Sequence, residues 1–245
     1  MGQGQSMIQR LLYTKTVRYA QPLKKAAVAT LESAGQHKTT AAAAAAAASR
    51  PRNFYRTSPL VWIDVESTGL VTDKDIILEV AMIITNDELE QLGPEQSIVI
   101  QRTPKELSSK LNPWSLKFHG GSGLLDEVKA STVTLDQAEK MLMSQIVTYC
   151  PKPGRALLAG NNVGFDRAML NKEMPVLANY LHFRNLDVST VNEMAKRWNP
   201  AMLQSHKKKF SHRAIDDIRE SIRELKHYKR MFLVHDNGNA DNAEK

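Results

Sequence analysis

The chain has 245 residues, of which 42% are hydrophobic, and its formal net charge is +7 at pH 7. This length supports one sizeable hydrophobic core, and a single cysteine, Cys150, excludes an internal disulfide framework. No apolar run approaches the ~20 residues needed to cross a bilayer, so we expect no transmembrane segment.

The positive charge is concentrated at the N-terminus. Residues 1–58 hold nine of the 33 Lys and Arg and one of the 26 Asp and Glu, so this segment carries +8 and the remainder −1. A nearly neutral remainder does not favour a long duplex-binding surface.

The first 58 residues have the composition of a targeting segment. They are basic, rich in hydroxyl groups and nearly free of acid, as mitochondrial transit peptides are, and residues 41–48 form a poly-Ala spacer. We therefore expect a disordered targeting segment and a location in the mitochondrial matrix. The opening MGQGQS also fits the pattern for N-myristoylation at Gly2, so a cytoplasmic, lipid-modified protein is the alternative.

The rest of the chain alternates between strand and helix patterns. Apolar β-prone runs predict strands at 60–66, 75–85, 96–102, 156–162 and 183–188. Apolar residues spaced by three and four predict helices at 122–131, 134–150, 166–181, 189–198 (capped by Ser189 or Thr190) and 211–232. This order predicts one α/β domain, a mixed β-sheet flanked by helices, over residues 59–233. The polar residues 234–245 are expected to be a disordered tail.

Two acidic residues interrupt the first predicted strand. Asp64 and Glu66 are separated by one residue, so on an extended strand they point to the same face. Two carboxylates roughly 5–7 Å apart repel by about 1 kcal/mol or more at intermediate dielectric. A cation is therefore expected beside them, and for this pair alone Lys or Arg partners at a solvated strand end are the alternative.

Further candidate residues stand at the start of two predicted helices. Asp166 follows the fourth strand, where an acid is also favoured simply by the helix dipole. His212 precedes Asp217 by five residues, about 1.4 helical turns, so the histidine is expected at the helix entrance with Asp217 projecting inward. Taken alone, His212 also fits an ordinary packed or solvated histidine.

Four segments carry a family resemblance: WIDVESTGL (62–70), GNNVGFDRAML (160–170), LDVSTVNEMAKRW (186–198) and HRAIDDIRES (212–221). With the spacing between them, they resemble the DEDDh family of 3′-to-5′ exonucleases and, within it, the oligoribonuclease family, over residues 60–233. The resemblance implies a ribonuclease H-like fold.

The resemblance also implies a catalytic set. Asp64, Glu66, Asp166 and Asp217 would hold two divalent ions, Mg²⁺ or Mn²⁺, which prefer carboxylate oxygens. His212 would be the general base that takes a proton from the attacking water. The family spacing selects Asp217, five residues after the histidine, over its neighbour Asp216.

The implied substrates are very short RNA oligonucleotides, down to dinucleotides, and the implied products are nucleoside 5′-monophosphates. Leu70 would insert between the two bases and Trp114 would stack on one of them. The positions that would close around the 5′ phosphate are His119, Arg184 and Ser189. Family members are homodimers in which the segment 182–184 reaches the neighbouring site, and the same is expected here.

The chain departs from the family pattern at three positions. Ser67 stands where Met is usual, Phe183 where Tyr is common, and Asn162 where the family has Ser, which weakens the phosphate cap at that residue. Two other functions stay open: a DEDDh exonuclease that acts on longer RNA or DNA 3′ ends, and a catalytically silent binding module.

Overall fold

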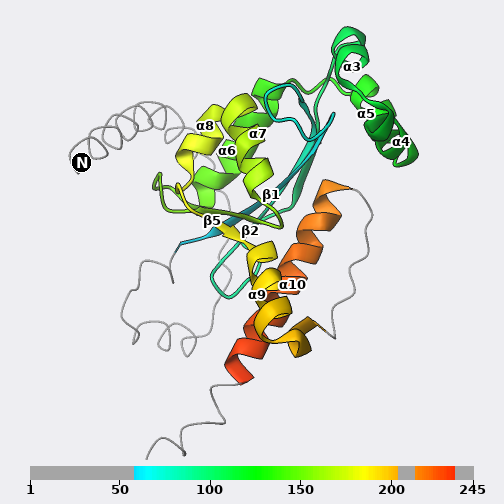
Figure 1. Cartoon of the computed structure of the whole chain (residues 1–245). Coiled ribbons are helices and arrows are strands. Elements are labelled where there is room, and N and C mark those ends of the chain that lie inside the picture. Colours follow the sequence, from blue (N-terminus) through cyan, green and yellow to red (C-terminus); the bar gives the residue numbers. More distant parts are fainter. Residues whose placement is uncertain (1–57, 204–212, 235–245) are drawn as a thin grey trace, which may run out of the picture.

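A five-stranded mixed sheet forms the centre of the computed structural model, which describes residues 58–203 and 213–234 (Figure 1). Its strands are β1 (Leu60–Ser67), β2 (Ile77–Thr85), β3 (Gln96–Val99), β4 (Leu157–Gly160) and β5 (Asn185–Asp187). They lie in the order β3-β2-β1-β4-β5, with β1, β2 and β3 antiparallel and β1, β4 and β5 parallel. The predicted α/β class with a mixed sheet is confirmed.

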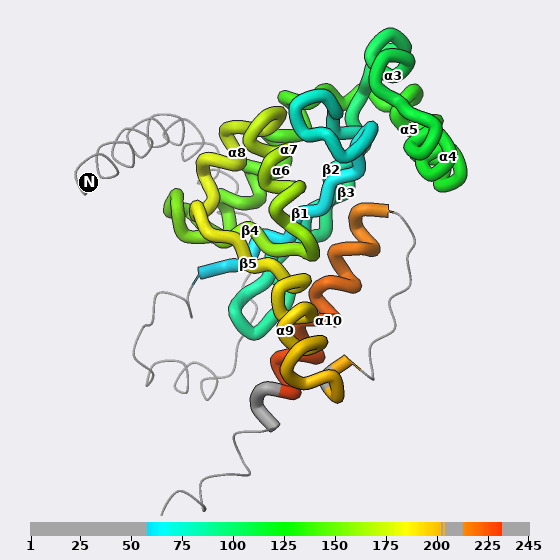
Figure 2. The backbone as a smooth tube through the Cα atoms, in the orientation of Figure 1, coloured from blue at the N-terminus to red at the C-terminus, as the bar shows by residue number. Residues whose placement is uncertain are grey.

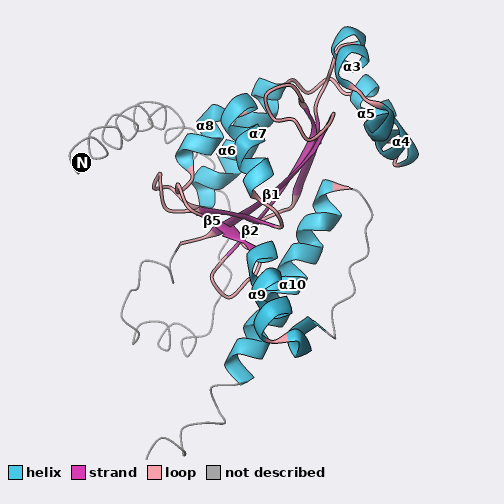
Figure 3. Ribbon diagram, in the orientation of Figure 1, coloured by secondary structure: helices cyan, strands magenta, loops and turns pink. Residues whose placement is uncertain are grey.

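One face of the sheet is covered by α6 (Leu135–Tyr149), α7 (Gly164–Glu173) and α8 (Pro175–Tyr180), as Figure 3 shows. Val61, Ile63 and Val65 of β1 point into this layer and share one buried core with side chains of the three helices. Burial of these branched side chains contributes about 1.5–3 kcal/mol each.

The other face is covered by α9 (Val188–Trp198), a short 3₁₀ helix (Pro200–Leu203) and α10 (Ala214–Val234). Trp62 of β1 is fully buried there with Ile218 and Tyr228 of α10. Because side chains alternate along a strand, Asp64 and Glu66 face α10 as Trp62 does.

Three short helices form what we call the helical arm: α3 (Pro104–Lys110), α4 (Pro113–Gly121) and α5 (Leu124–Ala130). The arm extends from one end of the sheet, apart from the α6–α8 layer (Figure 2). Its small core contains Leu78 of β2 with the arm side chains Leu107, Leu124, Leu125 and Val128.

A β-bulge turns Leu78 toward the arm. Glu66 pairs with Glu79 but Ser67 pairs with Ile77, so Leu78 has no partner on β1. The extra residue reverses the alternation of side chains along β2. Ile77 therefore packs in the same core as Val80, while Leu78 packs in the arm.

Several predicted helices differ from those found. The sequence predicted only the third helix of the arm, and the single helix expected over 166–181 is two helices, because Pro175 lacks the N–H that would continue α7. The predicted cap of α9 by Ser189 or Thr190 is wrong, since the Asp187 carboxylate accepts the Ser189 N–H at the helix start.

The expected targeting segment, the C-terminal tail and His212 lie outside the described residues. No helix in the described ranges is long and apolar enough to cross a bilayer.

Candidate active site

The site lies where β1 extends beyond its parallel neighbour. β4 pairs with β1 only as far as Trp62, opposite Ala159. Beyond that point the Val65 N–H donates instead to Asp166 Oδ1 of α7, at 3.0 Å. The end of β4 therefore leaves an opening beside β1, and a pocket of about 210 Å³ occupies it.

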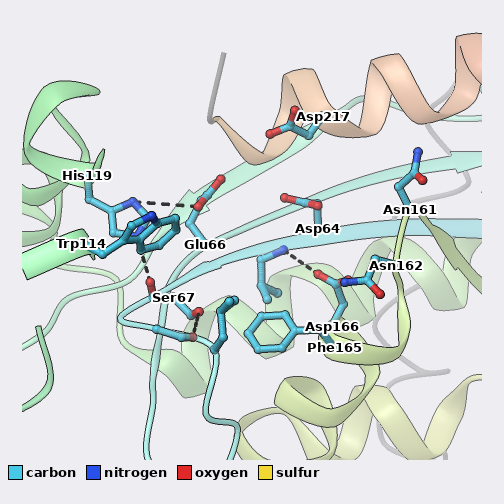
Figure 4. Close-up of a pocket in the computed structure, with 13 residues that line it drawn as sticks. Asp64, Glu66, Ser67, Trp114, His119, Asn161, Asn162, Phe165, Asp166 and Asp217 are labelled. Atoms are coloured by element: carbon cyan, nitrogen blue, oxygen red, sulfur yellow. Dashed lines mark hydrogen bonds and ion pairs between the residues drawn. The ribbon is translucent and has the colours of Figure 1, made fainter. Parts of the chain in front are cut away.

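Three carboxylates converge at this pocket (Figure 4). Asp64 and Glu66 come from β1 and Asp217 comes from the first turn of α10, and one oxygen of each lies within 4.8 Å of the others. Carboxylate oxygens at this spacing are suited to a hard divalent cation. The cluster is thus an acidic triad that could bind a metal ion.

Asp166 lines the same pocket but is not part of the 4.8 Å triad. It sits in the first turn of α7, and its bond to the Val65 N–H fixes its carboxylate against β1. Asp166 therefore closes the edge of β1 beside the pocket.

The pKa values of these acids reflect their shared burial. Burial, followed by repulsion from Asp166, Glu66 and Asp217, holds the pKa of Asp64 well above its usual range. Burial and then Asp217 and Glu79 raise the pKa of Glu66 to about 8. The pKa of Asp166 rises to about 7, mainly through burial, against the lowering effect of its backbone hydrogen bonds. Such clustered acids repel each other when ionised, and a bound cation would relieve that repulsion.

Asp216, next to the triad residue Asp217, makes a different contact. Its Oδ1 pairs with Arg219 Nη1 at 2.7 Å, one turn further along α10. Of the two adjacent acids, Asp217 is the one that lines the pocket.

Leu70 and Trp114 border the pocket from two different elements. Leu70 follows β1 and is 74% exposed, and Trp114 opens α4 and is 50% exposed. Two large apolar side chains held at the surface beside an acidic cluster form a surface on which a nucleobase could stack.

The loop that carries Leu70 is braced by Asp75, a buried acid that sequence reasoning missed. Asp75 Oδ1 accepts the Thr68 hydroxyl at 2.8 Å, and Oδ2 accepts the Val71 N–H at 2.7 Å. A side chain on Gly69 would collide with this carboxylate, since its Cβ would lie 2.7 Å from Oδ2. The only signal for Asp75 in the sequence is an acid shortly after a turn, which is too common to identify it.

His119 of α4 is buried behind the triad. Its Nε2 donates to the Ser67 carbonyl at 2.8 Å, and its Nδ1 lies 3.9 Å from Glu66 Oε2. The carbonyl can only accept, so the proton belongs on Nε2. His119 thus links the arm to the Ser67 carbonyl and places its ring beside Glu66.

The remaining two predicted substrate residues do not line the pocket. Ser189 donates its N–H and its hydroxyl to Asp187 Oδ1, which also accepts the Asn162 N–H. Arg184 lies on the surface with its guanidinium carbon 5.3 Å from the ring centroid of Phe183. The structure therefore brings Leu70, Trp114 and His119, but neither Arg184 nor Ser189, to the pocket of the same chain.

Asn161, a pocket residue given no role from the sequence, is held by a polar network. Its Nδ2 donates to Glu224 Oε2 of α10 at 2.8 Å, and Glu224 Oε1 accepts from Asn192 and from the Tyr228 hydroxyl. Glu224 is only 1% exposed. This network ties the end of β4 to α9 and α10.

Comparison with known proteins gives consistent results. The family model described as Exonuclease matches residues 61–225. An oligoribonuclease of Colwellia psychrerythraea is 43% identical over 176 residues, which cover 72% of this chain and 96% of that protein. A probable oligoribonuclease of Drosophila melanogaster is 47% identical over 172 residues, covering 69% of this chain and 80% of that protein.

Among solved structures, a zinc-bound complex of E. coli exonuclease I with single-stranded DNA is similar, with a TM-score of 0.58 and 16% identity. The match covers 74% of this chain but only 42% of that one, and at this identity it shows the fold alone. The two oligoribonucleases are more similar to this chain, at 43% and 47% identity, and the matches cover 96% and 80% of their lengths. The chain belongs to the oligoribonuclease family of exonucleases.

Proposed function

We propose that this protein is a 3′-to-5′ exoribonuclease that degrades very short oligoribonucleotides, dinucleotides especially, to nucleoside 5′-monophosphates. The observation that carries the proposal is the acidic triad of Asp64, Glu66 and Asp217 at the base of a pocket bordered by Leu70 and Trp114. The oligoribonuclease relatives point to the same substrates. We further propose that residues 59–233 are the exonuclease domain, in line with the family match over 61–225.

The acids fit divalent cations. Every donor in the triad is a carboxylate oxygen, and the raised pKa values of Asp64 and Glu66 mark a site where added positive charge is favourable. We assign Asp64, Glu66, Asp166 and Asp217 as the residues that would hold two Mg²⁺ or Mn²⁺ ions. Bound there, such ions would neutralise the phosphodiester and activate water.

The chain supplies orientation and proton transfer. The Val65 N–H fixes the Asp166 carboxylate to β1, so Asp166 of α7 is held beside Asp64 and Glu66 of that strand. His212, which precedes the described start of α10, is the proposed general base, since a neutral imidazole accepts a proton near pH 7.

The substrate contacts explain a preference for short RNA. Leu70 and Trp114 would hold the two bases, and His119, Arg184 and Ser189 are assigned to the 5′ phosphate. Closing around that phosphate would leave no exit for a longer chain. The near-neutral charge of residues 59–245 agrees with this, because few backbone phosphates have to be bound.

Arg184 would act in a homodimer. The proposed dimer places residues 182–184 of each subunit at the site of the other, and Phe183, 72% exposed and stacked on His182, is suited to such a contact. Light scattering of the wild type and of Phe183→Ala tests this: a monomeric wild type would refute the dimer, and a weakened dimer in the variant is expected.

We propose a mitochondrial matrix location, with a cytoplasmic and N-myristoylated form as the alternative. A fusion of residues 1–58 to a fluorescent protein tests the subcellular localisation, and a purely cytosolic signal would rule out the matrix.

The test of function is hydrolysis of 5′-labelled RNA of two, three, five and seven nucleotides with Mg²⁺. The wild type is compared with Asp217→Ala and with the matched control Asp216→Ala, whose side chain pairs with Arg219 instead. Fast dinucleotide cleavage that falls with length and is lost only in Asp217→Ala is expected. Equal or faster cleavage of long RNA or DNA would indicate a general DEDDh exonuclease, and no cleavage at all would indicate a binding module.

A further inference from the structure

We propose that Arg213 is a positioning residue that holds the helical arm, and with it Trp114, at a fixed distance from the acidic triad. The inference rests on the proposed function, in which Trp114 stacks on a base of the substrate while the triad holds the scissile phosphate.

Arg213 joins three elements, α10 through its backbone and β2 and α5 through its guanidinium. Its backbone carbonyl accepts the Asp217 N–H at 3.2 Å, at the start of α10. Its side chain pairs with Glu79 of β2, at 3.2 and 3.3 Å, and with Glu127 of α5, where two N–H groups reach the two carboxylate oxygens at 2.8 and 2.9 Å. The fork-shaped pair with Glu127 fixes direction as well as distance.

The Glu79 side of this contact is anchored in the core. Glu79 is fully buried, pairs with Glu66 in the strand register, and also accepts the Ser97 hydroxyl at 2.5 Å. A buried carboxylate with such partners does not move easily, because breaking the contacts leaves its charge unpaired. The guanidinium of Arg213 therefore links a rigid part of the sheet, at Glu79, to the arm, at Glu127.

The arm is also attached to the sheet by a small apolar core and by several hydrogen bonds. Its small core consists of Leu78 and four side chains of the arm, three Leu and one Val. Its polar contacts with the sheet and its loops include the His119 bond to Ser67 and the Asn112 bond to Thr68, the latter at 3.5 Å. The Lys110 ammonium donates to the Lys74 carbonyl at 2.6 Å, and the Ser131 hydroxyl donates to the Val99 carbonyl at 2.7 Å. None of these four bonds reaches α10, whereas the Arg213–Glu127 pair joins α5 to the start of that helix.

This geometry gives Arg213 two separable effects. Its pair with Glu79 joins the start of α10 to the buried core of the sheet. Its pair with Glu127 determines where the arm lies. Glu127→Gln weakens the second contact, because the amide is uncharged and keeps only one acceptor oxygen, and it leaves the Arg213–Glu79 pair in place. Glu127 is 46% exposed, so the substitution should not disturb folding.

The experiment is a double-mutant cycle on an RNA dinucleotide with Mg²⁺, using wild type, Glu127→Gln, Trp114→Ala and the double variant. We expect Glu127→Gln to raise KM about fivefold, the size of effect that a partly exposed ion pair can exert, with kcat within about twofold. In the Trp114→Ala background the same change should have no further effect, because the arm then has no base contact to position.

The matched control is Arg219→Gln on the same helix. It breaks the pairs of Arg219 with Glu95, just before β3, and with Asp216, neither of which belongs to the arm. It should leave KM unchanged. An unchanged KM in Glu127→Gln, an equal rise in both backgrounds, or the same rise in Arg219→Gln would each overturn the proposal. If the wild type fails to cleave the dinucleotide, or Trp114→Ala leaves KM unchanged, the proposed function itself fails, and this inference with it.

Discussion

Replacing Glu66 with Gln should abolish activity and yet stabilise the metal-free protein. Glu66 lies between Asp217 and Glu79, and burial together with these neighbours raises its pKa to about 8 from an ordinary 4.5. Below pH 4.5 the carboxyl is protonated in both the folded and the unfolded chain and costs nothing. Between pH 4.5 and pH 8 the unfolded chain releases the proton while the folded chain retains it, so the free energy of unfolding falls as the pH rises.

The size of this loss follows from the two pKa values. Each pH unit between them removes about 1.4 kcal/mol, so Glu66 alone costs the metal-free protein about 3 kcal/mol at pH 7. Gln has the shape of the protonated acid but never ionises, so Glu66→Gln should recover most of that amount. For a folded region of this size, about 3 kcal/mol corresponds to a rise in Tm of roughly 6–12 °C.

Thermal unfolding followed by circular dichroism in EDTA at pH 5 and pH 8 measures the effect. The gain should be small at pH 5 and largest at pH 8, and added Mn²⁺ should raise the Tm of the wild type more than that of the variant. Asp216→Asn on the neighbouring α10 is the matched control and should show no such pH-dependent gain. A Glu66→Gln protein that melts below the wild type at pH 8 in EDTA would refute the reasoning.

Other predictions concern the residues behind the pocket. Asp75→Asn weakens the brace of the Leu70 loop, so KM for a dinucleotide should rise by about three- to tenfold with little change in kcat; steady-state kinetics that match the wild type would contradict the brace. Gly69→Ala places a methyl group 2.7 Å from the Asp75 carboxylate and should shift KM in the same direction, measured in the same assay. Glu224→Ala leaves the Asn161 amide and its neighbours without their buried acceptor, so denaturant unfolding should show a loss of about 1–3 kcal/mol; an unchanged unfolding free energy would show that the network contributes nothing.

The sequence predicted the parts of the fold that have strong periodicity. β1 and β2 are mostly apolar runs of strand-forming residues, and α6 and α10 repeat apolar residues at helical spacing. These four elements were expected close to where they lie. The alternation along β1 also put Asp64 and Glu66 on one face, and both face α10. The choice of Asp217 over Asp216 came from family spacing; Asp217 lies in the triad, and its catalytic role stays a prediction.

The helical arm was harder to predict because its first two helices are short and are specified mainly by the residues at their N-termini. α3 and α4 depend on capping by Thr103 and Asn112 and on a proline at the first helical position, and α4 has little amphipathic pattern. The ion pairs of Arg213 could not be predicted from the sequence either, because Glu79 and Glu127 lie 134 and 86 residues away. Contacts over such separations depend on the folded arrangement and leave no local pattern.

The bulge at the start of β2 restricts which insertions and deletions this segment of the chain can accept. Leu78, the residue without a partner on β1, belongs to the arm, while Ile77 belongs to the core under α6–α8. Deleting one residue here would restore regular pairing and turn Leu78 away from the arm, and inserting one would rotate Glu79 away from Arg213. Point substitutions between hydrophobic residues should be tolerated at Ile77 and Leu78. Single-codon insertions and deletions should not be, so a library of such variants across residues 76–79 would be depleted of folded proteins.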